Sequence, residues 1–184
     1  SLTKIKFIAN SATTSENQIE TSGAYMVAGS DNTLEIHTAA SKFVFNADCS
    51  SMFDGLSTIT AIDFNDCVNT AEVTSMGAMF SGCSALTSLD LSNFNTEKVT
   101  NMGFMFYKCS SLESLNLSSF NTSNVEIMIS MFYNCSSLES LDLSRFNTEK
   151  VESMISMFDS CSALESLDLS SFNTANVTNM YNMF

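Results

Sequence analysis

Acidic side chains recur at two positions of a repeated motif, and regularly spaced carboxylates can bind cations or basic proteins. The first position holds Asp63, Asp90, Asn116, Asp142 and Asp168. The second lies three residues earlier and holds Glu113, Glu139 and Glu165. Stacked carboxylates about 5 Å apart repel one another unless cations, water or hydroxyl groups compensate. Three interpretations follow: an acidic face for a protein partner, weak calcium sites, or a solvated surface with serine partners.

Residues suited to enzyme chemistry are scarce. His37 is the only histidine, so a Ser-His or Cys-His nucleophile pair would depend on that one residue. The six glycines are scattered and form no phosphate-binding loop. The acidic residues form ladders rather than one distinctive acid and base pair. We therefore predict that the chain is not an enzyme and needs no cofactor.

Four of the six cysteines share one motif position, which predicts buried free thiols. They are Cys83, Cys109, Cys135 and Cys161. Equivalent side chains on adjacent repeats lie about 5 Å apart but run parallel, which is the wrong orientation for a disulfide. Cys49 and Cys67 stand at Met and Phe positions of the motif. No C-x-x-C pair or histidine cluster is present, so no metal site is predicted.

The charge of the chain bears on its partners. Its 20 acidic side chains against 7 basic ones give a net charge of -13 at pH 7. Such a surface repels phosphate backbones, so nucleic-acid binding is not expected. No apolar run approaches the roughly 18 residues that span a bilayer, so no membrane insertion is expected. Because the chain starts at Ser1 and stops within the motif at Phe184, we expect it to be part of a longer protein.

A motif of 26 residues positions these side chains. The Met-Phe pair recurs six times, with one step of 27 residues and then four steps of 26. Between pairs the pattern is MFxxCSxLxSLxLSxFNTxxVxxMxx, whose Met and Phe positions predict core residues. Repeats of this length stack as coils of a solenoid, because one repeat cannot bury its apolar side alone.

Each repeat predicts one strand and one short helix. Residues 112–117 follow L-x-x-L-x-L, whose last part alternates as in a half-buried strand. Residues 102–109 carry Met, Met, Phe and Cys at i, i+3, i+4 and i+7, which is the spacing of one helix face. We therefore predict an α/β fold: a leucine-rich-repeat solenoid with a parallel sheet on one face and short helices on the other.

The first part of the chain lacks the motif and predicts a strand-rich cap. Residues 4–8 alternate in polarity, and residues 25–28 and 34–37 form an expected hairpin. A solenoid needs such a cap to shield its first coil. The predicted organisation is a cap at residues 1–50 and a solenoid of about five units at residues 51–184.

Residues between the inward-pointing leucines should face solvent and form the candidate partner-binding face. These residues are Ser88, Asp90, Ser92, Glu113, Asn116, Glu139, Asp142, Arg145, Glu165 and Asp168. Arg145 stands near Asp142 and can relieve local charge. Asn-Thr pairs follow the strand, as at residues 121–122, and predict turns held by side-chain hydrogen bonds. A regular threonine column is, as an alternative, the pattern of ice-binding solenoids.

The motif SLxSLDLSxFNTxxVxxMxxMFxxCSSL, over residues 52–184, resembles the 26-residue repeat of BspA-like leucine-rich-repeat surface proteins. The strand-rich start also resembles the segment that precedes such repeats. This resemblance implies a secreted or surface-attached bacterial protein, associated with adhesion to host proteins or cells and without enzymatic activity. The resemblance supplies no shared ligand-binding residues.

The leading hypothesis is a binding module that engages a protein partner, such as a host extracellular protein, through the solenoid surface. Repeats of this kind create extended binding surfaces. The alternative is a structural spacer whose near-identical coils display another domain. Variation at Asn116 and Arg145 favours binding, whereas the similarity of the coils favours the spacer.

Overall fold

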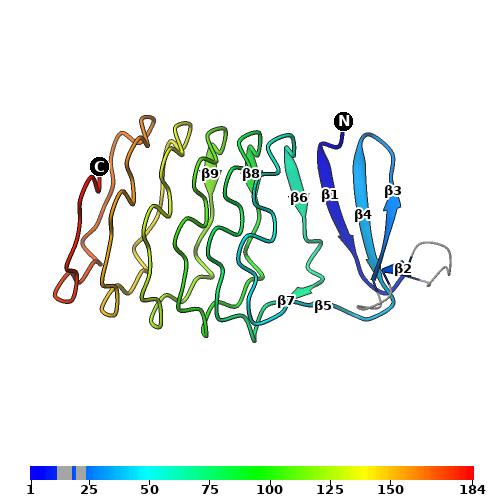
Figure 1. The fold of residues 1–184 in the computed structure, drawn as a ribbon, viewed down its shortest axis with the longest axis horizontal. Coiled ribbons are helices and arrows are strands. Elements are labelled where there is room, and N and C mark those ends of the chain that lie inside the picture. Colours follow the sequence, from blue (N-terminus) through cyan, green and yellow to red (C-terminus); the bar gives the residue numbers. More distant parts are fainter. Residues whose placement is uncertain (12–17, 20–23) are drawn as a thin grey trace.

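The coils of the chain lie side by side along one long axis (Figure 1), with equivalent residues of successive coils next to one another. The structure is a computed structural model that describes residues 1–11, 18–19 and 24–184. The strands are β1 (Lys4–Ile8), β2 (Gln18–Ile19), β3 (Ala24–Ala28), β4 (Thr33–Thr38), β5 (Phe43–Val44), β6 (Ala61–Asp63), β7 (Val68–Asn69), β8 (Ser88–Leu89) and β9 (Ser114–Leu115).

The strand-rich start and the first coil share one five-stranded sheet of order β2-β3-β4-β1-β6. β3 and β4 form an antiparallel hairpin, as predicted. Asp31 and Asn32 lie between them with φ of 54° and 59°, a left-handed conformation that these two residue types tolerate in turns. β1 lies between β4 and β6 and is parallel to both. The N-terminal segment therefore adds a parallel strand to the first coil and a hairpin beyond it.

Successive coils are parallel and in register. β8 pairs with β9, with Leu89 opposite Leu115, and β5 pairs with β7 in the same parallel sense. A further ladder of parallel bridges joins Asp48, Ser75, Asn101, Ile127, Ser153 and Asn179. These pairings confirm that equivalent residues of consecutive coils lie beside one another.

The predicted short helices are wrong, and with them the α/β leucine-rich-repeat fold class. The described residues contain no helix, and the fold is a β-solenoid of parallel strands. In residues 102–109, Phe104 and Lys108 have φ of 59° and 58°, which breaks a helical path. Alternate amides in this segment bond to the next coil, as when the Phe104 N–H donates to the Ile129 carbonyl at 2.8 Å.

The two left-handed residues lie within tight turns, Phe104 in the turn from Met102 to Met105 and Lys108 in the turn from Phe106 to Cys109. The Met105 N–H donates to the carbonyl of Met102, three residues earlier, at 3.2 Å. Turns that repeat every four residues bring Met102, Met105, Phe106 and Cys109 to the interior, where all four are fully buried. The i, i+3, i+4, i+7 spacing is therefore produced by a chain of turns.

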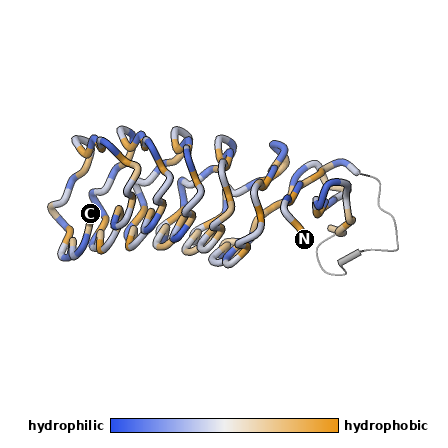
Figure 2. Tube along the Cα trace, turned by 90° about the horizontal axis from the view of Figure 1, so that it is seen from above, coloured by the Kyte–Doolittle hydropathy of each residue, from blue (hydrophilic) through white to orange (hydrophobic). Residues whose placement is uncertain are grey.

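The interior column of the Met-Phe pairs is filled by phenylalanine in every coil. Successive phenylalanine rings of the Met-Phe pairs stack with centroids 5.4 to 5.9 Å apart and ring planes within 15° of parallel. These rings are Phe53, Phe80, Phe106, Phe132, Phe158 and Phe184. The same succession of hydrophobic and hydrophilic stretches recurs from coil to coil (Figure 2). Within the described ranges, no helix is long and apolar enough to cross a membrane.

Candidate functional site

All ten residues of the predicted partner-binding face are exposed. The leucines between them point inward, and Leu89, Leu115 and Leu141 are 6 to 8% exposed. A shallow polar hollow crosses β8 and β9 and is lined by Ser88, Asp90, Ser92, Leu89, Ser114 and Asn116. The solenoid thus brings the acidic positions of successive coils together along one face, which we call the acidic face.

The aspartates of the acidic face also hold the backbone. Their Oδ1 atoms accept a hydrogen bond from the backbone N–H two residues later, at 2.8 to 3.0 Å. The acceptors are Asp63, Asp90, Asn116, Asp142 and Asp168. Asn116 makes the same bond as the aspartates, so this role needs an oxygen but no charge.

Serine donors lower the pKa of three aspartates of this face. The pKa of Asp90 is lowered by the backbone N–H and then the hydroxyl of Ser92. The pKa of Asp142 is lowered first by the hydroxyl of Ser144, with a smaller contribution from the Arg145 charge. The pKa of Asp168 is lowered by the backbone N–H and then the hydroxyl of Ser170, against a smaller raising effect of the Asp142 charge. Hydrogen bonds to the charged form favour that form, so these carboxylates, which are charged at neutral pH in any case, stay charged to lower pH than an ordinary aspartate does.

The glutamates of the acidic face stack in the same register. Glu113, Glu139 and Glu165 are exposed, and the Glu139 N–H donates to the Glu113 carbonyl at 3.3 Å. Arg145 donates from Nη1 to the carbonyl of Ser118 at 3.3 Å, which ties its side chain to the preceding coil. In the part of the chain that the structure describes, no three His, Cys, Asp or Glu side chains converge as a metal site. In the described residues, the carboxylates of the acidic face therefore lie in rows along the coils and do not converge on a common metal position.

The predicted free thiols of the cysteine column are confirmed, and Cys83, Cys109 and Cys135 are buried as expected, whereas Cys161 is half-buried. Each thiol donates to a phenylalanine carbonyl at 3.0 to 3.1 Å, as when Cys109 donates to Phe80 and Cys135 donates to Phe106. Burial raises the pKa of Cys83 to about 11 and raises the pKa values of Cys109 and Cys135 further. These thiols stay protonated and are poor nucleophiles.

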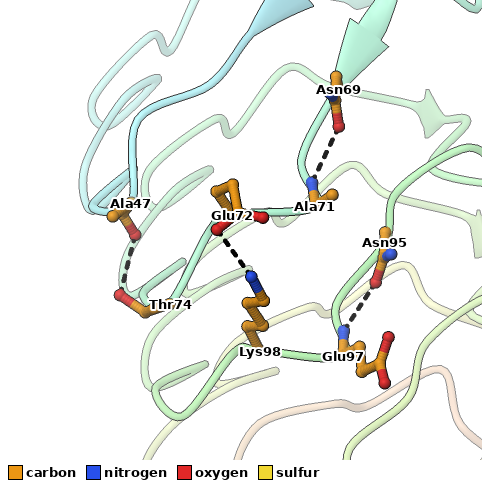
Figure 3. Close-up of polar contacts among 8 residues, drawn as sticks. All are labelled: Ala47, Asn69, Ala71, Glu72, Thr74, Asn95, Glu97 and Lys98. Atoms are coloured by element: carbon orange, nitrogen blue, oxygen red, sulfur yellow. Dashed lines mark hydrogen bonds and ion pairs between the residues drawn. The ribbon is translucent and has the colours of Figure 1, made fainter.

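The Asn-Thr pairs hold the turns and join the coils. The Asn95 Oδ1 accepts from the Glu97 N–H at 2.9 Å, and Asn69 does the same for Ala71 (Figure 3). Lys98 reaches Glu72 on the preceding coil, with Nζ 2.7 Å from Oε2. The predicted turn role of asparagine is confirmed.

The threonines of these pairs bond one coil to the next. Thr70, Thr96, Thr122 and Thr148 are at most 1% exposed. Each hydroxyl donates to the asparagine carbonyl of the next coil and accepts from the N–H of that asparagine, at 2.8 to 3.0 Å. An ordered-water template needs exposed hydroxyls, so this buried column does not serve as an ice-binding surface.

The structure also brings together aromatic side chains at positions that the repeat pattern does not single out. Phe104, Tyr107, Lys108 and Tyr133 form a cluster on the turn segments, which we call the turn ridge. The signal for it was available in the sequence, because Ala78 stands at the motif position of Phe104 and small residues are usual there. A consensus motif for the repeat hides a residue such as Phe104 that departs from it in one coil only.

Comparison with known proteins identifies a family for the repeats. Neither the search of curated proteins nor that of solved structures found a match. The family model described as "Mycoplasma protein of unknown function, DUF285" matches residues 47–142 and 115–184. These two matches together span more than half of the chain and follow the coils from the first Met-Phe pair onward. The chain therefore belongs to this family of mycoplasma proteins of unknown function.

Proposed function

We propose that the chain is a non-catalytic binding module that engages a protein partner through the surface of its solenoid. The acidic face carries this proposal. Its carboxylates are exposed and charged at neutral pH, and serine donors lower the pKa values of Asp90, Asp142 and Asp168 further. Charges of one sign that lie in register on successive coils attract a partner of the opposite sign and orient its approach.

The partner suited to this face is a protein with a basic surface. The chain carries a net charge of -13, so attraction to a basic protein adds to the local contacts. The resemblance to BspA-like surface proteins supports a host or extracellular protein as the partner. The same resemblance supports a cell-surface or extracellular location for the chain.

A structural spacer is the second candidate function. Its support is the continuous inter-coil bonding, in which Thr96 and Thr122 each tie their coil to the next by two hydrogen bonds. Such coupling makes a stiff rod that can display another domain. The spacer role needs no specific outer face, and this difference separates the two functions.

The test uses a triple variant in which Asp90, Asp142 and Asp168 are each changed to Asn. It measures how well this variant captures basic extracellular-matrix and serum proteins at physiological salt. Asn preserves the turn bond, because Asn116 already makes it in the native chain. A matched control replaces Glu97, Glu149 and Glu152 with Gln, which removes the same charge from exposed positions elsewhere. We expect saturable capture by the native chain and the control, and loss of capture by the aspartate variant.

Two outcomes decide against binding through this face. If the native chain captures none of these proteins, the spacer function gains. If the aspartate and glutamate variants lose capture equally, the attraction is a matter of net charge and the acidic face is not a specific site. Unfolding midpoints of the variants, measured beside the native chain, show whether the fold is intact.

A further inference from the structure

The turn ridge departs from the repeat on the outside of the solenoid. Phe104 is 41% exposed, whereas the equivalent positions of other coils carry Ala78, Ser130, Ser156 and Asn182. Tyr107 and Tyr133 are half-buried at a position where the coil before them carries Ser81. The interior columns already fill the core without these rings. Clustered aromatic residues at a surface are typical of protein-binding sites.

The rings of the turn ridge form one ordered stack. Tyr107 and Tyr133 lie face to face with centroids 4.9 Å apart and planes 18° from parallel. Phe104 packs edge-on against Tyr107 at 5.6 Å. The ammonium of Lys108 lies 5.0 Å from the Tyr107 ring centroid. The ridge thus already attracts a cation to an aromatic face within the chain itself.

The stack ends at a carboxylate. One coil beyond Tyr133, the same motif position is Asp159, and the Asn134 N–H donates to the Asp159 carbonyl at 2.8 Å, so the two coils are in contact here. The Asp159 Oδ1 accepts from the Ser160 hydroxyl at 2.8 Å. Over residues 1–11, 18–19 and 24–184, the ion pairs present do not involve Asp159. An aromatic ring and a carboxylate without a cationic partner therefore stand on adjacent coils.

The chemistry that fits this pair is a planar cation. A guanidinium group stacks on aromatic faces and bonds to a carboxylate with its fork of donors, whereas an ammonium group does neither as well. The negative charge of the chain favours a basic ligand, and Ile127, also 41% exposed, adds apolar surface one coil beyond Asn101. A peptide segment that carries arginine and an apolar residue matches both features.

We propose that the turn ridge binds an arginine-containing segment of a protein partner. The guanidinium lies over Tyr133 beside Asp159, and an apolar side chain of the same segment contacts Phe104. This inference rests on the proposed binding function. It adds a second binding surface, made of other residues than the acidic face.

The test uses two synthetic peptides of equal length and charge, acetyl-Gly-Leu-Arg-Gly-Arg-Gly-amide and its lysine counterpart. Calorimetry gives the affinity, and tyrosine fluorescence reports the site, because the chain has four tyrosines and no tryptophan. Tyr133→Ser and Phe104→Ser install residues that other coils carry at these positions, so the fold is expected to persist. Asp159→Asn removes the charge alone, and Tyr181→Ile is the control, since Ile155 is its equivalent.

We expect the native chain and the Tyr181→Ile control to prefer the arginine peptide. Tyr133→Ser and Asp159→Asn each weaken its binding by about tenfold, the scale of one cation–π contact or one ion pair at a partly desolvated site. Equal binding of both peptides, unchanged affinity in Tyr133→Ser, or no peptide binding by the native chain overturns the inference.

Failure of the inference can be told apart from failure of the proposed function. If Tyr133→Ser captures a protein partner as well as the native chain does, while the Asp90, Asp142 and Asp168 variant loses it, the acidic face alone binds. If the native chain captures no protein but binds the arginine peptide through Tyr133, the ridge stands without the proposed use of the acidic face.

Discussion

Replacement of Thr122 by Val removes one inter-coil link and leaves the shape of the side chain nearly unchanged. The Thr122 hydroxyl donates to the Asn147 carbonyl at 2.9 Å and accepts from the Asn147 N–H at 2.8 Å. The side chain is 1% exposed, so water cannot readily replace the lost partner. Valine creates no cavity, and the measured change therefore reports the two hydrogen bonds.

The size of the effect follows from these two bonds. Each contributes about 0.5 to 1.5 kcal/mol net, so the variant loses about 1 to 3 kcal/mol of unfolding free energy. The upper part of this range applies if the Asn147 N–H remains buried without an acceptor. The control is Thr174→Val, because Thr174 is exposed, and its replacement should change stability by less than about 0.5 kcal/mol.

The assay is urea denaturation followed by far-ultraviolet circular dichroism, with midpoints and slopes fitted together. A lower midpoint at unchanged slope is the expected result for Thr122→Val. If both valine variants match the native chain, the buried threonines are not links between coils and the account of coil coupling fails.

Three further predictions follow from the same geometry. Phe106→Ala empties a fully buried position in the ring stack and should lower the free energy of unfolding, measured by urea denaturation, by about 3 to 5 kcal/mol. Phe184→Ala removes a ring that is 73% exposed and should lower it far less, so equal losses would contradict the stack. Thiol labelling of Cys83, Cys109 and Cys135 in the native chain at pH 8 should be slow, because burial raises the pKa of Cys83 to about 11 and keeps the thiol protonated. Rapid labelling of these three cysteines without unfolding would refute their burial. The lowered pKa values of Asp90, Asp142 and Asp168 contribute stability that is present above the unfolded aspartate pKa and is lost as the pH falls through the folded values. The triple Asn variant should therefore lose less stability on acidification than the native chain does. Identical pH profiles of the unfolding free energy would show that these hydrogen bonds do not favour the charged form.

The parallel register and the N-terminal hairpin were predictable because they depend on signals that only one structure satisfies. Leu89 and Leu115 recur at a fixed step, and coils of fixed length place such residues side by side. Asp31 and Asn32 mark a turn between two alternating segments. The exposure of the acidic face followed from the same alternation.

The helices were wrongly predicted because the spacing of Met102, Met105, Phe106 and Cys109 fits both a helix and a series of four-residue turns. Local periodicity does not distinguish an amide that bonds within its own turn from one that bonds to the next coil. A signal for turns lay at the left-handed positions, where Gly82 and Asn134 stand in one motif column with Lys108. The turn ridge was missed for a different reason, because Phe104 departs from the repeat.

The most direct measurement of the account is the scalar coupling across the hydrogen bond of the Phe104 amide, observed by NMR on the isotope-labelled chain. The β-solenoid predicts a coupling from the Phe104 N–H to the Ile129 carbonyl of the next coil, and none from the Phe106 N–H to the Met102 carbonyl. A coupling between Phe106 and Met102, four residues apart as in an α-helix, together with no coupling between Phe104 and Ile129, would contradict the stacked coils on which both proposed binding surfaces depend.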